Sequence, residues 1–259
     1  AAGCEINVAE GSDSHKGRNG ADDGVVLING SDKDVYTIVA VITYEGSDYY
    51  HSFGSLASAL EFATDDATVT LIRDIELDKT AVIPAGKTVT IDLNGKTISG
   101  VDKSDKGNYE LITNNGNLTI KDTAGEGAII LTAENDRNWD AYSAVIANVA
   151  GGNLVVAGGN IEHLGGTDMA YGIDNLTNGS GGDAKTTING GSIKSVYRAI
   201  RQFANSSSCM NELTITGGVI KSTGGNRAVW LQSANASANK ASLTIGGIAD
   251  VGKVYVSGP

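Results

Sequence analysis

A short alternation of apolar and polar residues recurs six times between residues 89 and 245 of this chain. Each copy is a three-residue β-strand core, usually with a threonine between two apolar residues. The copies are Val89-Thr90-Ile91, Leu118-Thr119-Ile120, Leu154-Val155-Val156, Thr186-Thr187-Ile188, Leu213-Thr214-Ile215 and Leu243-Thr244-Ile245, at intervals of 29, 36, 32, 27 and 30 residues. A fixed motif at a variable period of about 30 residues is typical of stacked units joined by loops of unequal length. The pattern therefore predicts a solenoid.

Two further short strands accompany each copy of the motif. One precedes it, as in Ala199-Ile200-Arg201-Gln202, and one follows a glycine pair, as in Gly191-Ser192-Ile193. Three strands and three turns describe a coil of triangular cross-section. Alternation turns Leu, Ile and Val inward and the intervening residues outward. The predicted fold is an all-β parallel β-helix over residues 67–259.

The first 66 residues have a different pattern. Residues 1–50 are expected to form a flexible lead-in with a β extension, in which 25–28 and 35–44 make a hairpin-like pair. Residues 51–66 are expected to hold a helix, because Leu56, Ala59, Leu60 and Ala63 share one helical face after a serine N-cap. An open solenoid end exposes core and strand edges, so this helix is predicted to act as a cap.

The stretch from residue 53 to residue 100 resembles a known class of proteins. The residues that carry the resemblance are Ser55-Leu56-Ala57-Ser58-Ala59-Leu60, Thr68-Val69-Thr70-Leu71-Ile72-Arg73-Asp74-Ile75 and Ile83-Pro84-Ala85-Gly86-Lys87-Thr88-Val89-Thr90-Ile91. They are similar to the opening of bacterial cell-surface, adhesin-like proteins of the pectin-lyase-like right-handed parallel β-helix class. The resemblance covers about a fifth of the chain. It implies a right-handed coil, an extracellular or cell-surface location and an association with glycans. Because that class also includes polysaccharide lyases, polysaccharide hydrolases and phage tail fibres, it implies no particular reaction.

Composition narrows the choice of partners. The formal net charge of −11 argues against nucleic acid and other polyanions. No apolar run approaches 18 residues, so no membrane span is expected. The chain has 35 glycines and 2 prolines, which suits a fold with many tight turns and few backbone N–H groups outside a ladder.

The two cysteines are Cys4 and Cys209. Cys4 closes the string Ala1-Ala2-Gly3-Cys4, which resembles the end of a bacterial lipoprotein signal and makes Cys4 a candidate lipid anchor. The alternatives are an ordinary cysteine or a disulfide with Cys209, and the sequence does not choose among them.

A candidate ligand platform lies on the strand that precedes the motif. The outward column of this strand is read as Ile112, Ile146, Asp174, Arg201 and Trp230. The last three are expected on successive coils about 4.8 Å apart. An aromatic ring can stack on the C–H face of a sugar while a charged pair hydrogen-bonds its hydroxyls. The alternative is an ion pair with a cation–π neighbour that only stabilises the sheet.

The outward threonines of the motif strands and the recurring tyrosines each have a structural explanation as well as a functional one. Threonines dominate the outward column of the motif, which is also typical of ice-binding faces, but the neighbouring column is irregular and favours an ordinary exposed strand. Tyrosines recur before the candidate platform with a spacing that slips by one residue, which suggests stacked rings at a corner. These tyrosines are Tyr109, Tyr142, Tyr171 and Tyr197.

No cofactor is expected, although two acidic loops are candidates for Ca²⁺. One loop has Asp168, Asp174 and Asp183, and the other has Glu134, Asp136 and Asp140. Neither has the regular spacing of a dedicated calcium loop.

We expect a non-catalytic protein. A β-helix hydrolase needs carboxylates that converge on one face, and a lyase needs a cationic or Ca²⁺ cluster with a base. The coils carry no Asn-Thr-Asp, Asp-Asp or Gly-His-Gly pattern. The expected function is adhesion or binding of polysaccharide or host-surface glycan outside the cell.

Two alternatives remain open. One is a polysaccharide lyase or glycoside hydrolase. The other is a homo-oligomer or extracellular filament built head to tail, since residues 254–259 end on a strand with no visible cap.

Overall fold

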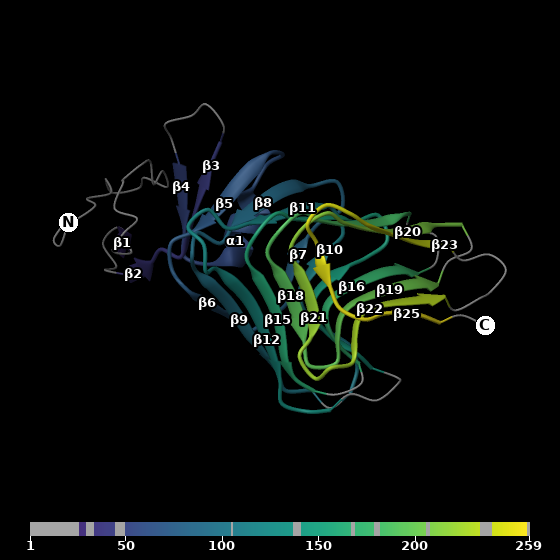
Figure 1. Ribbon diagram of the computed structural model, residues 1–259. Coiled ribbons are helices and arrows are strands. Elements are labelled where there is room, and N and C mark those ends of the chain that lie inside the picture. The colour runs from purple at the N-terminus through teal and green to yellow at the C-terminus, as the bar shows by residue number, and fades with distance from the viewer. Residues whose placement is uncertain are drawn as a thin grey trace.

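The fold is a parallel β-solenoid (Figure 1), seen in a computed structural model that describes residues 26–29, 34–44, 50–104, 106–136, 141–166, 169–178, 182–205, 208–233 and 240–257. From β5 onward, successive strands pass from one sheet to the next in a fixed order, so each strand pairs with the strand three places later. This confirms the predicted parallel β-helix architecture.

Three sheets form the walls of the solenoid. Sheet 1 contains β4 (Tyr50–Phe53), β3 (Ala40–Thr43), β5 (Ala67–Leu71), β8 (Thr88–Asp92), β11 (Asn117–Lys121), β14 (Asn153–Val156), β17 (Ala184–Ile188), β20 (Met210–Ile215) and β23 (Lys240–Ile245). Sheet 2 contains β6 (Ile75–Leu77), β9 (Thr97–Asp102), β12 (Ala128–Ala133), β15 (Asn160–Gly165), β18 (Ser192–Ser195), β21 (Val219–Ser222) and β24 (Asp250–Val251). Sheet 3 contains β7 (Ala81–Ile83), β10 (Tyr109–Asn114), β13 (Ser143–Asn148), β16 (Ala170–Asn178), β19 (Arg198–Asn205), β22 (Arg227–Ser233) and β25 (Val254–Ser257).

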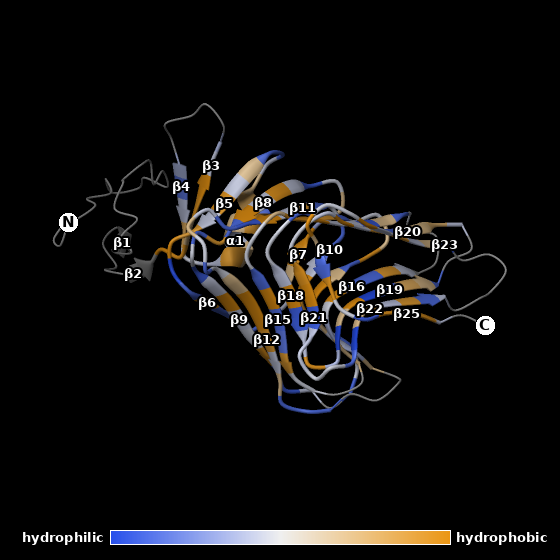
Figure 2. Ribbon diagram, viewed as in Figure 1, coloured by the Kyte–Doolittle hydropathy of each residue, from blue (hydrophilic) through white to orange (hydrophobic). Residues whose placement is uncertain are grey.

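The six motif strands lie side by side in sheet 1 in the expected register. The partners across successive strands are Thr90, Thr119, Val155, Thr187, Thr214 and Thr244. From β8 to β20 the apolar residues on either side of this column are buried, whereas Ile245 in the last motif strand is 46% exposed; Figure 2 shows the alternation of apolar and polar residues along the strands. The buried residues form one continuous apolar core along the solenoid.

Glycine pairs turn the chain from sheet 1 into sheet 2. Gly191 adopts φ +73°, and a Cβ there would overlap the carbonyl oxygen of Gly159 in the preceding turn. Gly218 repeats the arrangement one turn later, with φ +82° and the carbonyl oxygen of Gly191 2.8 Å from its ideal Cβ position. The turns therefore stack too closely for side chains, and only glycine combines that contact with a left-handed backbone.

Helix α1 (Leu56–Phe62) begins at the predicted N-cap, where the Ser55 hydroxyl accepts a hydrogen bond from the backbone N–H of Ser58. Leu56, Ala59 and Leu60 are buried on one face, and the helix packs on β3, β4 and β7. Its role as a cap on the solenoid stays a prediction.

The N-terminal strands are antiparallel. β1 (Val26–Asn29) pairs with β2 (Asp34–Thr37), and β3 pairs with both β4 and β5. The boundaries predicted for a lead-in and β extension over residues 1–50 stay a prediction. Cys4, the candidate lipid anchor, lies outside the described residues.

The predicted outward column of sheet 3 needs one correction. Ile112 and Ile146 are fully buried in the main core; Ile112 pairs with Ile146, and Ile146 pairs with Ile173 rather than with Asp174. The reason is that two consecutive residues, such as Leu111 and Ile112, both face the core, so strict alternation breaks at this point of each strand.

A ladder of amide side chains runs inside sheet 3, and the sequence reading did not identify it. Asn114 donates from Nδ2 to Oδ1 of Asn148 at 2.8 Å, and Asn148 donates in the same way to Asn175 at 2.8 Å. Asn175 continues the ladder to Oε1 of Gln202. All four side chains are buried, so the ladder satisfies polar groups that water cannot reach.

Candidate functional site on the outer face of sheet 3

Asp174, Arg201 and Trp230 lie in register on three adjacent strands, as the sequence predicted. They occupy the face of sheet 3 opposite the main core, since the preceding residues, such as Ile173, belong to that core. The structure differs in their exposure. Asp174 is 0% exposed, Arg201 5% and Trp230 4%, so none of them forms an open surface.

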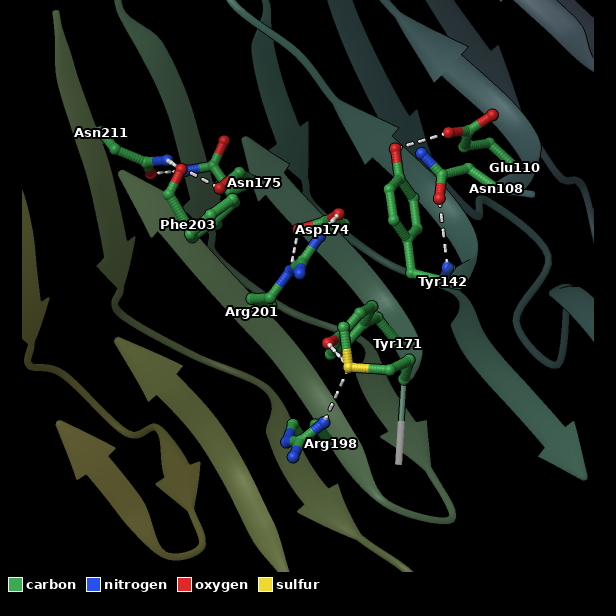
Figure 3. Close-up of polar contacts among 11 residues, drawn as sticks. Asn108, Glu110, Tyr142, Tyr171, Asp174, Asn175, Arg198, Arg201, Phe203 and Asn211 are labelled. Carbon is green, nitrogen blue, oxygen red and sulfur yellow. Dashed lines mark hydrogen bonds and ion pairs between the residues drawn. The ribbon is translucent and has the colours of Figure 1, made fainter. Parts of the chain in front are cut away.

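Asp174 and Arg201 form a bidentate ion pair (Figure 3). Arg201 donates from Nε to Oδ1 at 2.8 Å and from Nη2 to Oδ2 at 2.5 Å. Aromatic rings surround the guanidinium: Tyr142, Tyr171 and Phe203 lie with ring centroids 5.0, 4.5 and 4.9 Å from its Cζ. These rings explain the burial, because they cover the pair on the outer face of the sheet. Both carboxylate oxygens of Asp174 already accept hydrogen bonds from Arg201.

Burial also raises the pKa values of the two tyrosines that contact the ion pair, Tyr142 and Tyr171. Burial raises the pKa of Tyr142 above its usual value, and the nearby Asp174 carboxylate and the hydrogen bond from the Tyr142 hydroxyl to Glu110 Oε1 (2.6 Å) act in the same direction. Burial raises the pKa of Tyr171 as well, while Arg201 opposes that shift. Both phenols are therefore neutral in the ordinary pH range, and neither is a base at neutral pH.

Arg198 is a second buried arginine with a different environment. It is 1% exposed, and its Cζ lies 4.2 Å from the Trp230 ring centroid and 4.3 Å from that of Tyr197. Arg198 donates from Nη1 to the Met169 sulfur at 3.8 Å (Figure 3), and its Nε has no hydrogen-bond partner among the described residues. Within the part of the chain that the structure describes, no carboxylate forms an ion pair with Arg198. Arg198 is thus a buried cation without a counter-charge there.

Arg227 extends this arginine and aromatic layer toward solvent. It pairs in register with Arg198 across β19 and β22, so two cations lie on adjacent strands. Its Cζ lies 4.1 Å from the Tyr255 ring centroid and 5.4 Å from that of Trp230. Trp230 itself donates from Nε1 to the Ser257 hydroxyl at 2.7 Å. Tyr255 is 44% exposed, whereas the other rings of the layer are buried or half-buried.

An open pocket of about 560 Å³ adjoins Arg227 and Tyr255. Lys253, Gly224 and Gly225 also line it, and no acidic residue lines it within the part of the chain that the structure describes. Lys253 Nζ donates to the Gly225 carbonyl oxygen at 3.4 Å. A pocket of this size is in the range of small-ligand sites, and it combines an aromatic ring with two cations.

The structure describes only some of the residues in the two candidate calcium loops. Asp168 and Asp140 lie outside the described residues. Asp174 is bound by Arg201, and Asp183 Oδ1 accepts a hydrogen bond from the backbone N–H of Met210 at 2.7 Å. Over the described ranges no group of three or more His, Cys, Asp and Glu side chains is placed to hold a metal.

The remaining predicted residues serve packing where the structure describes them. Tyr142 and Tyr171 pack with ring centroids 6.4 Å apart, while Tyr197 contacts Arg198, so the tyrosines do not form a single stack. Cys209 is buried, and Cys4, with which the sequence left a disulfide open, lies outside the described residues. In the described segments no helix is long and apolar enough to cross a membrane.

Arg198, Arg227, Lys253 and Tyr255 were missed by the sequence reading, although a signal was present. The four-residue phrases Tyr171-Gly-Ile-Asp174, Arg198-Ala-Ile-Arg201 and Arg227-Ala-Val-Trp230 occupy equivalent places on consecutive strands. Reading both ends of each phrase as outward would have brought Arg198 and Arg227 together.

Comparison with known proteins adds no functional assignment. No protein-family model matches the chain, and neither the curated proteins nor the solved structures yielded a match. The assignment of a parallel β-solenoid rests on the structure alone, and kinship with the pectin-lyase-like class stays a prediction.

Proposed function

We propose that this solenoid is a non-catalytic glycan-binding protein of the cell exterior that uses the outer face of sheet 3. The observation that carries the proposal is the layer of arginines and aromatic rings that emerges at Arg227 and Tyr255 beside an open pocket. An accessible tyrosine ring can stack on the C–H face of a sugar, and a guanidinium can donate hydrogen bonds to its hydroxyls.

The predicted residues Asp174, Arg201 and Trp230 then have a supporting role. Trp230 contacts both Arg198 and Arg227, and its N–H donates a hydrogen bond to Ser257. The buried ion pair fixes the strands beneath the accessible residues. A ligand therefore contacts Tyr255 and Arg227 first, one strand further along the solenoid than the sequence indicated.

A polysaccharide panel tests this function when each sample is scored twice, for protein retained by the glycan and for new reducing ends or unsaturated products. Retention without product is expected. Tyr255→Ala removes the ring and should abolish retention, whereas Tyr255→Phe keeps the ring and should preserve it. Product formation would show an enzyme instead. Retention that survives Tyr255→Ala would move the site elsewhere.

Assembly into a filament is a second candidate. Ile248 is 91% exposed and Val256 71%, and both lie next to the last strands of the described chain. Exposed apolar side chains beside strand edges favour association with another copy. Light scattering over a range of protein concentrations tests this, and a mass that stays monomeric throughout would exclude it.

A further inference from the structure

We infer that the pocket beside Tyr255 recognises a negatively charged group on the sugar, a carboxylate or a sulfate ester. The inference rests on the proposed glycan binding and adds the chemical class of the ligand. Arg227 and Lys253 supply two positive charges to the pocket, and none of the described residues that line it is acidic. The chain has a net charge of −11, so this positively charged pocket differs in sign from the protein as a whole.

The buried neighbour Arg198 is an independent observation that points the same way. Its side chain is 1% exposed, its Nε has no hydrogen-bond partner in the described ranges, and it lies in register with Arg227 on the next strand. Like charges on directly opposite positions of a sheet repel, and a buried charge is costly without compensation. An anion at Arg227 supplies the missing negative charge for both arginines.

Among the described residues, Asp174 and Asp250 do not supply it. Asp174 makes both of its ion-pair contacts to Arg201, and Asp250 pairs with Lys221 at 2.6 Å. Aromatic contacts hold the guanidinium groups in place: Trp230 lies beside both Arg198 and Arg227. A guanidinium held in this way loses little conformational entropy when it donates to a carboxylate or sulfate.

The geometry divides recognition between two groups. Tyr255 offers a ring for the sugar face, while Arg227 and Lys253 offer donors to the charged substituent. Hydrogen bonds to charged groups contribute more than those to neutral hydroxyls, so an acidic sugar should bind about tenfold or more tightly than its neutral counterpart. Added salt should weaken binding of the acidic sugar and leave the neutral one nearly unchanged.

Calorimetric titration with three oligosaccharides of equal length and linkage tests the inference. One ends in glucuronic acid, one in glucose and one in glucose 6-sulfate. Tighter binding of either acidic form, lost in Arg227→Gln and in Lys253→Gln, is expected, and the order of the two acidic forms identifies the preferred anion. Lys221→Gln is the matched control, because it removes one positive charge from an exposed ion pair on sheet 2.

The outcomes separate this inference from the function on which it rests. Equal binding of all three sugars, with no effect of Arg227→Gln, would overturn the anion site and leave glycan binding intact. No binding of any sugar here or in the polysaccharide panel would overturn both. Equal losses in Arg227→Gln and Lys221→Gln would show a general charge effect and overturn the pocket. Thermal unfolding of each variant establishes that it is folded.

Discussion

Arg201 and Asp174 face each other across two adjacent strands and share two hydrogen bonds in a site that water does not reach. Removing one partner leaves an uncompensated buried charge. We expect Asp174→Asn and Arg201→Met each to lower the free energy of unfolding by about 3–5 kcal/mol. Urea denaturation measures this.

The double variant should lose less than the sum of the two single losses, because it leaves neither charge behind. The exposed pair Lys221–Asp250 is the control, and breaking it should cost at most about 1 kcal/mol. Additive losses at Asp174 and Arg201 would show that the two side chains do not act as a pair.

Substitution of Asn148, at the centre of the amide ladder, should destabilise the protein. Asn148 accepts from Asn114 and donates to both Asn175 and the Lys185 carbonyl oxygen. Asn148→Leu removes these bonds and leaves buried neighbours without partners, so we expect a loss of about 3 kcal/mol in unfolding free energy. Asn117→Ala removes an exposed hydrogen bond to Thr88 and should cost no more than about 0.5 kcal/mol. Similar stabilities of the two variants in denaturation would contradict the ladder's importance.

The stacked glycine turns make a second prediction about stability. Gly191→Ala combines a left-handed backbone with an overlap against the Gly159 carbonyl oxygen, so we expect a loss of about 2–4 kcal/mol. Gly86 has φ +80° but open space around its Cβ position. Gly86→Ala should therefore cost only about 1–2 kcal/mol, from backbone strain alone. A difference in thermal unfolding between the two variants isolates the stacking of turns, and equal losses would exclude it.

Alkaline pH should destabilise the protein through its buried tyrosines. Burial raises the pKa of Tyr142 and of Tyr171 above the value of about 10 that a tyrosine has in the unfolded chain. The unfolded state then binds fewer protons than the folded state above pH 10. The stability that the neutral phenols contribute is therefore complete below pH 10 and is lost as the pH rises further.

Absorbance of the phenolate measures this titration. We expect Tyr142 and Tyr171 to ionise only when the chain unfolds, together with the alkaline loss of circular dichroism. Tyr142→Phe should remove one such late-ionising group. Ionisation of every tyrosine near pH 10 in the folded protein would contradict the burial of these rings.

Sequence was a good guide to sheet 1 and a partial one to sheet 3. Strict alternation holds in the motif strands, so the threonine column and the inward Leu and Ile residues could be read directly. In sheet 3 consecutive residues such as Leu111 and Ile112 both face the core, and alternation alone misplaced Ile112. The register of Asp174, Arg201 and Trp230 was nevertheless correct, because the apolar residue before each one sets the alignment.

Burial of that platform could not be read from the sequence. Exposure depends on rings from other turns of the solenoid: Tyr142, just before β13, and Tyr171, on β16, both cover Arg201 on β19. The ladder of Asn114, Asn148 and Asn175 was visible as amides at corresponding points, separated by 34 and 27 residues. Because the reading sorted residues into apolar-inward and polar-outward, inward polar residues were overlooked.

The ladder has a consequence for how the chain tolerates change in length. A strand that slips by one residue places an amide opposite an apolar side chain and breaks the hydrogen bonds of both neighbours. The connections between strands carry no such constraint, since the motif intervals vary from 27 to 36 residues while the amides stay aligned. Inserted segments are therefore accommodated in the connections, and whole three-strand units can be duplicated or lost without changing the alignment of the rest. The buried amides fix the register of the strands, and the loops between the strands can vary in length and sequence.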